Sequence, residues 1–383
     1  MAVDPCLHPS EIGVVDSIFC NNSHIFCGLD SGKVGVYSFN DGQWVRDLMP
    51  GEVDAVHCNA TKVAGSDLVV AAIMWSSIVT VWSSKKEMEQ LYCLNIVNYP
   101  CMGISCEHSE DYDESEVEEI QVVGNKVVFL RFDWWQTSLI VIDKGEQNVW
   151  ESKTLACIND MGSNPPLATD ENCIAVAKLV DTSYGRIAMP STTEVKLWQN
   201  DTFRQDICLL ECSPLPFYTN IALKLPFLVV SSKGGCVKVY QLAADKGMEE
   251  VGAVASLMKC IQVAGAVKQL IFNTLFFGFV LGPNDNDDKR QFVVLIEKKV
   301  LLDEGIPGEE TEKRGVLLHD DGSTYTVSMN TTSLVFALWL KTDEDDDGES
   351  VDIDDLEDGD LDQESDEEEV VIPFHKKDFW KTS

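Results

Sequence analysis

A short hairpin pattern recurs along the chain, and it limits the fold more than any other feature of the sequence. In its clearest copy, residues 228–241, an apolar run leads into a turn that contains Gly234 and Gly235. Glycine can adopt the positive φ that tight hairpin turns need. The residues from Val237 to Tyr240 then alternate between two faces, as in a half-buried β-strand. The stretch therefore predicts two antiparallel strands joined by a tight turn.

The second strand of this hairpin has counterparts throughout the sequence. The matching segments are Val34–Tyr37, Val79–Trp82, Leu139–Ile142, Val195–Trp198, Val237–Tyr240 and Phe292–Leu295. Where no long loop intervenes, successive copies are separated by about 40 to 45 residues, which is the repeat length of propeller blades. This period favours one array of similar sheets over two or three unrelated domains.

Each repeat contains further strand-like segments. The first has Val14–Cys20, His24–Leu29, Lys33–Phe39 and Gln43–Leu48; the second has Val53–Asn59, Leu68–Met74, Ile78–Ser83 and Leu91–Val97. The third repeat also has four such segments, the fourth, fifth and sixth have three each, and the seventh has only Thr324–Met329 and Ser333–Leu340. Four short antiparallel strands joined by turns make one propeller blade. We therefore predict an all-β fold, a single β-propeller of seven four-stranded blades, over residues 1–341.

A strongly acidic run follows the last repeat. Asp343–Glu369 contains 18 acidic residues and no basic one, so it has too little apolar surface to order itself. We predict that residues 342–369 are disordered. Residues 370–383 return to strand character at Val370–Phe374, and we expect them to close the seventh blade by pairing with its last strand. Another acidic patch, Glu107–Glu119, is expected to be an exposed loop.

The charge balance narrows the range of partners. The chain of 383 residues carries 64 Asp and Glu against 29 Lys and Arg, a net charge of −35. Nucleic-acid binding needs basic patches, so this balance argues against it and favours either basic protein partners or simple solubility. No run of about 18 apolar residues predicts a membrane-spanning helix, and the first residues do not form a signal peptide.

The cysteines and histidines do not indicate a metal or catalytic site. The 13 Cys include no Cys-x-x-Cys pair, so we expect reduced, mostly buried thiols in a cytoplasmic or nuclear protein. The six His are far apart in the sequence. Motifs for phosphate loops, nucleophile elbows, zinc proteases and dinucleotide binding are missing. We predict no enzymatic activity, no cofactor and no metal.

The repeats resemble the WD-repeat family. The match is clearest at Gly28–Tyr37 and Ser231–Tyr240, where a Gly-containing turn precedes an alternating strand that ends in an aromatic residue. It covers roughly Val14 to Leu340, although the family's Gly-His dipeptide is missing and no Trp is followed by Asp. The resemblance implies a propeller, usually of seven blades, that serves as a rigid platform for protein–protein contacts. The repeats look most like the substrate-recognition half of F-box/WD proteins, although no F-box-like segment precedes Val14.

Two hairpin loops offer candidate partner-binding residues, because propeller strands are committed to the core. Trp134 and Trp135 stand side by side at one predicted hairpin tip, and Tyr184 and Arg186 lie in another. Aromatic and Arg side chains dominate interface energies, so we predict that these four residues bind a protein partner. The alternative for the tryptophans is that one packs into the blade and the other caps it.

Two further candidates lie near the acidic run. Ser365 precedes Asp366-Glu367-Glu368, as in the sites of acid-directed kinases. Val370, Val371 and Ile372 follow three glutamates and resemble a SUMO-interacting strand that adds to the sheet edge of a partner. The alternative is that these apolar residues form an internal propeller strand.

Three functions stay open on the sequence alone. The chain is predicted to be an interaction scaffold or adaptor, with a ubiquitin-ligase substrate-recognition subunit as a variant of that role. It could instead be an acidic, chaperone-like binder of basic proteins such as histones or ribosomal proteins. Salt dependence distinguishes the scaffold or adaptor, with its ubiquitin-ligase variant, from the acidic binder. Binding driven by charge weakens steeply as ionic strength rises. The oligomeric state is not indicated.

Overall fold

The structure is a computed structural model in which most strands and tight turns are described. The described residues are 15–29, 31–50, 62–74, 77–85, 87–96, 116–133, 136–145, 148–158, 166–170, 173–180, 192–209, 218–232, 235–242, 256–262, 266–272, 276–282, 291–297, 314–319, 324–329, 333–339 and 374–378. In this part of the chain, no helix is long and apolar enough to cross a membrane.

The described strands form antiparallel sheets that follow the order of the chain. The first three sheets contain β1 (Val15–Cys20), β2 (His24–Leu29), β3 (Val34–Ser38) and β4 (Trp44–Leu48); β5 (Lys62–Gly65), β6 (Val69–Met74), β7 (Ile78–Ser83) and β8 (Gln90–Asn95); and β9 (Glu116–Val123), β10 (Lys126–Asp133), β11 (Gln136–Lys144) and β12 (Trp150–Ile158).

The remaining sheets repeat the same order. They contain β13 (Leu167–Asp170), β14 (Cys173–Val180), β15 (Thr192–Gln199) and β16 (Thr202–Leu209); β17 (Tyr218–Lys224), β18 (Phe227–Ser232), β19 (Cys236–Gln241) and β20 (Ser256–Gln262); β21 (Ala266–Phe272), β22 (Phe276–Gly282), β23 (Gln291–Glu297) and β24 (Arg314–His319); and β25 (Thr324–Met329), β26 (Ser333–Trp339) and β27 (Phe374–Asp378).

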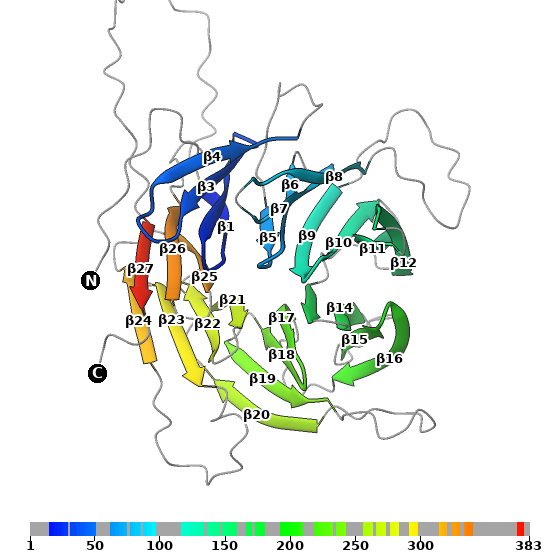
Figure 1. The fold of residues 1–383 in the computed structure, drawn as a ribbon. Coiled ribbons are helices and arrows are strands. Elements are labelled where there is room, and N and C mark those ends of the chain that lie inside the picture. Colours follow the sequence, from blue (N-terminus) through cyan, green and yellow to red (C-terminus); the bar gives the residue numbers. More distant parts are fainter. Residues whose placement is uncertain are drawn as a thin grey trace, which may run out of the picture.

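The sheets are arranged as a ring around a central axis (Figure 1). The first strand of each sheet contacts the first strand of the next, from β1 through β5, β9, β13, β17 and β21 to β25. The ring closes because β25 in turn contacts β1. The backbone N–H of Cys20 donates to Ser328 Oγ across this junction, at 3.1 Å. Fourth strands such as β4, β12 and β20 form the outer rim.

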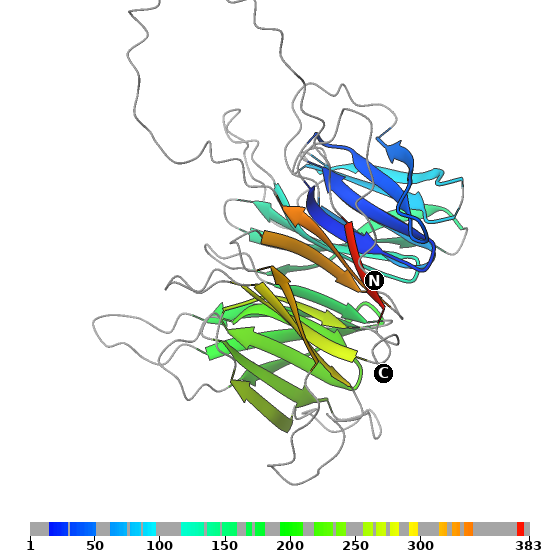
Figure 2. The ribbon, with the colours of Figure 1, turned by 90° about the vertical axis from the view of Figure 1, so that its left-hand side faces the viewer.

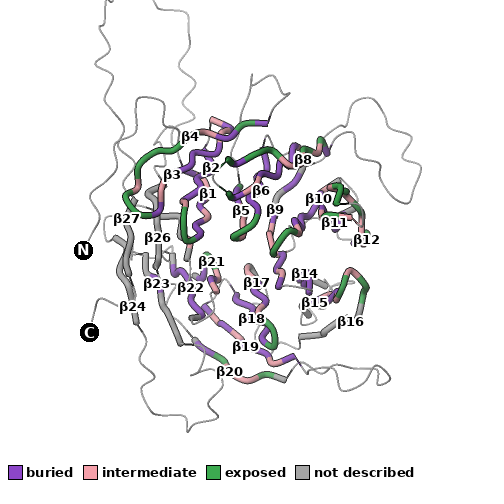
Figure 3. Tube along the Cα trace, in the orientation of Figure 1, coloured by how far each residue is buried: buried purple, intermediate pink, exposed green. Residues whose placement is uncertain are grey.

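The core lies between neighbouring sheets. β6 and β18 consist entirely of buried residues, because a sheet covered on both faces has no solvent side and loses its polar alternation. One core cluster joins Phe26 of β2 to Met74 of β6, and similar clusters join each following pair of sheets up to the sixth. Figure 3 shows the buried inner strands and the more exposed rim.

The position of β5 corrects the prediction for the second sheet. The predicted Val53–Asn59 lies outside the described residues, and the first strand of this sheet is Lys62–Gly65. A Cβ atom on Gly65 would lie only 2.4 Å from the ring of Phe19 in β1. Close packing against the first sheet therefore selects a small residue here, and the segment is too short and too weakly apolar to stand out in the sequence.

Other boundaries also differ from the prediction. The fourth strands β16, β20 and β24 were not predicted. β16 lacks an apolar run, whereas β20 and β24 contain short apolar segments that the prediction did not assign. The patch Glu107–Glu119 is not wholly a loop, since its last four residues belong to β9 and Val117 is buried there. The described part of the last sheet has three strands instead of the predicted four.

The C-terminal strand pairs with β26. The pairing is antiparallel, from Ser333 opposite Asp378 to Ala337 opposite Phe374. In Figure 2 this strand, coloured red, lies beside the last sheet. The strand begins at Phe374, whereas residues 342–373, which include most of the predicted strand, lie outside the described residues.

The prediction of mostly buried cysteines is wrong for the cysteines that the structure describes. The seven whose side chains are described are all free, and only Cys20, Cys27 and Cys173 of these are buried. The three exposed ones, Cys93, Cys157 and Cys260, each lie in the fourth strand of a sheet. A rim strand has one sheet neighbour and faces solvent, so a strand-like sequence there does not imply burial.

Candidate functional site

One end of the ring carries two kinds of tight turn. In a four-stranded antiparallel sheet, the first and third connections lie at the same end of the strands. We call this the turn end; its described turns include residues 21–23, 66–68, 124–125, 148–149, 200–201 and 225–226. The second connections, and those that lead to the next sheet, lie at the opposite end.

A cavity of about 480 Å³ lies where the inner strands of six sheets reach the turn end. Its polar lining consists of Cys20, Asn21, Asn22, Ser66, Asp67, Gln121, Thr169, Asp170 and Lys224. Its apolar lining includes Phe19, Leu167, Leu223 and Phe272. Thr169 Oγ1 is buried without a hydrogen-bond partner among the described residues. The volume falls within the usual range for ligand pockets, about 300–1,000 Å³.

Asp170 holds the fourth and fifth sheets together at the wall of this cavity. Its side chain is only 7% exposed. One carboxylate oxygen is paired with Lys224 Nζ, and the other accepts the backbone N–H of Leu225 at 2.8 Å. Lys224 is the last residue of β17, and Leu225 begins the turn between β17 and β18. A single carboxylate therefore fixes the position of a neighbouring turn by its charge and by its geometry.

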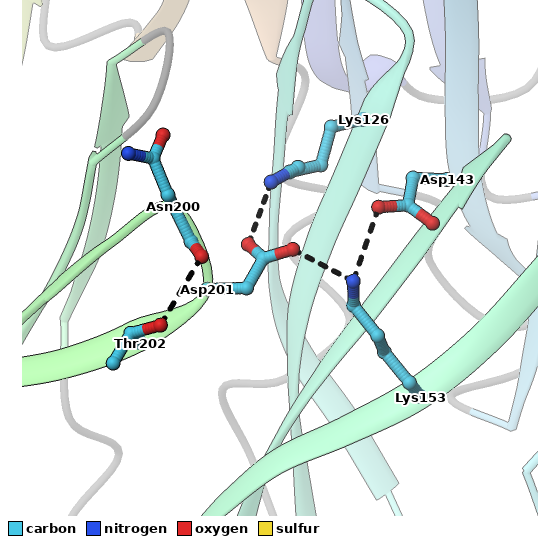
Figure 4. Close-up of polar contacts among 6 residues, drawn as sticks. All are labelled: Lys126, Asp143, Lys153, Asn200, Asp201 and Thr202. Atoms are coloured by element: carbon cyan, nitrogen blue, oxygen red, sulfur yellow. Dashed lines mark hydrogen bonds and ion pairs between the residues drawn. The ribbon is translucent and has the colours of Figure 1, made fainter. Parts of the chain in front are cut away.

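Asp201 makes the corresponding link between the third and fourth sheets (Figure 4). Asn200 and Asp201 have φ of 48° and 60°, and they form a two-residue hairpin turn of the kind that requires positive φ. The turn projects Asp201 between two lysines of the third sheet. Its carboxylate is 2.6 Å from Lys126 Nζ and 2.7 Å from Lys153 Nζ. Lys153 also pairs with Asp143, at 3.3 Å.

These contacts shift the ionisation of both partners. Burial alone would raise the pKa of Asp201, but hydrogen bonds and charges from Lys126 and Lys153 outweigh it, so the pKa lies below its ordinary value. Burial alone would lower the pKa of Lys153, but its contacts with Asp201 and Asp143 leave it raised. Both residues are therefore charged at neutral pH, and the link is intact there.

We expect Asp201→Asn to lower the free energy of unfolding by about 1–2 kcal/mol at pH 7, since it removes charge-assisted bonds from a largely buried oxygen pair. A carboxyl whose pKa is lowered in the folded state stabilises the protein at pH values above the ordinary Asp pKa. This stabilisation is lost as the pH falls through the folded-state pKa. The difference between variant and wild type should therefore shrink below about pH 4. Urea unfolding from pH 7 down to pH 3 measures it.

Asp67→Asn is the control for this prediction. Asp67 lies in a turn at the same end, and its carboxylate takes part in none of the ion pairs among the described residues. An equal loss of stability in both variants would show that the effect is one of net charge and would contradict a specific role for Asp201.

Exposed apolar side chains gather at the turn end. Eight large apolar residues are exposed in the described part of the chain: Trp44, Val45, Met49, Leu68, Val149, Phe203, Leu225 and Leu257. All except Met49 lie in the turns of this end or in the first two residues of a fourth strand, which starts from it. Single exposed apolar residues are ordinary, so the feature of interest is that seven of these eight belong to the same end of the ring.

The residues predicted from the sequence as partner contacts are not among those described. Trp134 and Trp135 fall between Asp133 and Gln136, which pair at the end of β10 and β11 away from the cavity. Tyr184 and Arg186, Ser365, and Val370, Val371 and Ile372 also lie outside the described residues. Sequence reasoning missed Asp170 and Asp201, because their partners are 54 and 75 residues away in the chain.

The described residues do not suggest a metal site. Among them, no group of three or more His, Cys, Asp or Glu could hold an ion. Asp170, the buried carboxylate of the cavity wall, is bound to a lysine nitrogen and a backbone N–H.

Comparison with known proteins shows the fold. No protein-family model matches the chain, and no curated protein matches it. The propeller domain of Cps50 (Swd1) from Myceliophteria thermophila has a TM-score of 0.59 at 8% identity over 88% of this chain and 96% of that one. A chain of the complex of KlAtg21 with the coiled coil of AgAtg16 has a TM-score of 0.54 at 10% identity, over 86% of this chain and 95% of that one. Sqt1 from Saccharomyces cerevisiae has a TM-score of 0.51 at 9% identity, over 88% of this chain and 84% of that one. At these identities the likeness establishes architecture alone, and the chain is a β-propeller.

Proposed function

We propose that this protein is a non-enzymatic scaffold or adaptor of the WD-repeat type that binds a protein partner at its turn end. The observation that carries the proposal is that seven of the eight exposed large apolar side chains of the described residues belong to this one end of the ring. One of them, Leu225, lies in a turn whose backbone N–H is bound by the Asp170 carboxylate. A rigid surface with apolar anchors loses little conformational entropy on binding.

The proposal extends to the whole chain. The seven sheets are taken as seven blades of one propeller over residues 1–341, completed by a strand from residues 370–383. Residues 342–369 then form an acidic connection between β26 and β27. The ring contact between β25 and β1 and the pairing of β26 with β27 support this arrangement. A cytoplasmic or nuclear location agrees with it.

Structural relatives of the same fold occur in protein complexes. The KlAtg21 structure contains the coiled coil of AgAtg16, and another match, with a TM-score of 0.53 at 10% identity over 87% of this chain and 91% of that one, comes from the mitotic checkpoint complex. These partners are those of the relatives. They support a protein partner here as a class and do not indicate which protein.

A pair of matched variants tests where the partner binds. Leu68 and Leu225 at the turn end are each 43% exposed, and Met49 at the other end is 40% exposed. Replacing both leucines by Ser should remove the main captured partner in a pull-down quantified by mass spectrometry, while Met49→Ser should retain it. Exposed substitutions of this kind change stability little, so thermal unfolding should be the same in both.

The same assay tests the sequence-based proposal for the opposite end. If Trp134→Ala with Trp135→Ala abolishes binding and the leucine variant does not, the partner binds the other end and the turn-end proposal is wrong. Washing at high salt distinguishes the scaffold from the remaining alternative, an acidic binder of basic proteins. An acidic binder of basic proteins would lose its partner as charges are screened, whereas contacts made by apolar anchors would persist. Ser365 as a phosphorylation site and Val370–Ile372 as a sheet-augmenting strand stay proposals.

A further inference from the structure

Two cysteines face each other on the outer part of the fifth sheet. Cys236 is the first residue of β19, and Cys260 lies in β20, the rim strand of the same sheet. Their sulfur atoms are 3.6 Å apart. The register places Cys236 opposite Gln262 and Cys260 opposite Lys238, so the two thiols are diagonal neighbours on one face of the sheet.

The pair is accessible from solvent. Cys260 is exposed and Cys236 is partly exposed, because β20 has a neighbour on one side only. The ammonium-bearing side chain of Lys238 belongs to the same face, directly across from Cys260. Thiol oxidation requires access for the oxidant and a second thiol within reach, and both conditions are met here.

We propose that Cys236 and Cys260 form a reversible oxidation site, at which a hydroperoxide converts the two thiols into a cross-strand disulfide. One thiolate attacks the peroxide, takes up one oxygen atom as a sulfenic acid and releases an alcohol or water. The second thiolate then attacks the sulfenic sulfur, the S–S bond forms, and hydroxide leaves as water after taking up a proton. Two thiols are oxidised by two electrons and one peroxide bond is reduced.

Two other described thiols, Cys93 and Cys27, have different surroundings. Cys93 is exposed, but its sulfur lies 3.6 Å from the Thr80 hydroxyl, not beside a second thiol. Cys27 is fully buried, and burial followed by the nearby Cys20 raises the pKa of its thiol well above the ordinary value. An inner-strand thiol of this kind stays protonated and is out of reach of an oxidant, unlike the solvent-accessible Cys236 and Cys260.

The bond would tie the rim strand to its neighbour covalently. Closing a contact of 3.6 Å to an S–S bond of about 2.05 Å needs a small movement. Cys236 can supply it, because it begins its strand directly after Gly235, which has a φ of 76°. Diagonal neighbours start farther apart than ideal disulfide partners, which makes the bond strained and readily reduced by cellular thiols.

Peptide mapping tests the proposal on the intact protein. The reduced full-length chain is treated with hydrogen peroxide, capped with an alkylating reagent and digested with trypsin. The expected product links residues 234–238 to residues 260–268, with equal loss of both free thiols. Dithiothreitol should restore both. The link should disappear in Cys260→Ser and persist in Cys93→Ser, and it should not form when the protein is oxidised in denaturant.

Three results would overturn the proposal. One is full alkylation of both thiols in peroxide that oxidises Cys93. Another is separate conversion of each cysteine to its sulfinic acid without a linked peptide. The third is linkage of Cys236 or Cys260 to other cysteines at the same yield in folded and unfolded protein, since the sheet geometry would then have no part in the pairing. The wild-type measurement decides each case, so folding of the variants is not critical.

Discussion

Truncation after Lys341 is expected to destabilise the protein severely and to cause aggregation. The truncated chain lacks β27, which pairs with β26 over five residues. Each ladder hydrogen bond contributes about 0.5–1.5 kcal/mol, so several kcal/mol are lost from a total that is typically about 5–15 kcal/mol. The loss also exposes the backbone of β26 as a new sheet edge, and unpaired edges promote self-association. Thermal unfolding and light scattering measure the two effects.

An internal deletion separates the strand from the acidic run. Replacing Asp343–Glu369 by a short Gly/Ser link keeps β27 and should preserve the melting temperature within a few degrees. A shorter connection between paired strands costs less closure entropy, and the dependence on length is only logarithmic. If truncation after Lys341 leaves stability unchanged, β27 does not close the ring, and the C-terminal residues are free to act as a partner motif.

The strands that the sequence predicts best are largely buried strands such as β7, β19 and β3. Ile78–Ser83 was predicted with the bounds that β7 has, because its β-branched and aromatic residues are typical of a strand. Cys236–Gln241 and Val34–Ser38 follow glycine turns with positive φ at Gly235 and Gly32, as the hairpin pattern requires. Residue type and turn glycines therefore predict the strands of a single sheet, and they do not predict how one sheet contacts the next.

The strands that the sequence missed depend on neighbours. β16 reads Thr-Phe-Arg-Gln-Asp-Ile-Cys-Leu, and only its pairing with β15 makes it a strand. β5 is set by the space that Phe19 leaves beside Gly65. Exposure of the cysteines at the rim likewise follows from a strand's place in its sheet. Such features depend on contacts between strands and sheets in the assembled ring, so a short stretch of sequence cannot predict them.

The candidate site illustrates the same limit. An aromatic pair such as Trp134-Trp135 is conspicuous in a sequence, whereas Leu68 and Leu225 are ordinary residues until the ring places them at one end. Asp170 and Asp201 look like turn residues, and their partners come from the neighbouring sheet. The fold class was therefore open to prediction, and the surface that the fold creates was not.

Asp170→Ala is expected to cause the largest loss of stability of any single substitution at the turn end, about 2–4 kcal/mol. It leaves the Leu225 N–H without its acceptor and Lys224 without its counter-ion. The backbone N–H, which is bonded to a carboxylate only 7% exposed, accounts for most of the loss, because Lys224 is 34% exposed and water screens its charge. Asp170→Asn keeps an oxygen for the N–H and should lose less. Urea unfolding of both variants measures the difference.

A double-mutant cycle with Lys224→Met separates the ion pair from the backbone bond. Lys224→Met removes the counter-ion while the carboxylate still accepts the Leu225 N–H, so its cost should be about 1 kcal/mol. The coupling between Asp170 and Lys224 should then be clearly smaller than the loss in Asp170→Ala. A coupling as large as the whole Asp170→Ala effect would mean that charge, and not the capped N–H, fixes the β17–β18 turn. In that case high salt should loosen this wall of the cavity, and the turn-end surface would not be the salt-resistant platform that the proposed function needs.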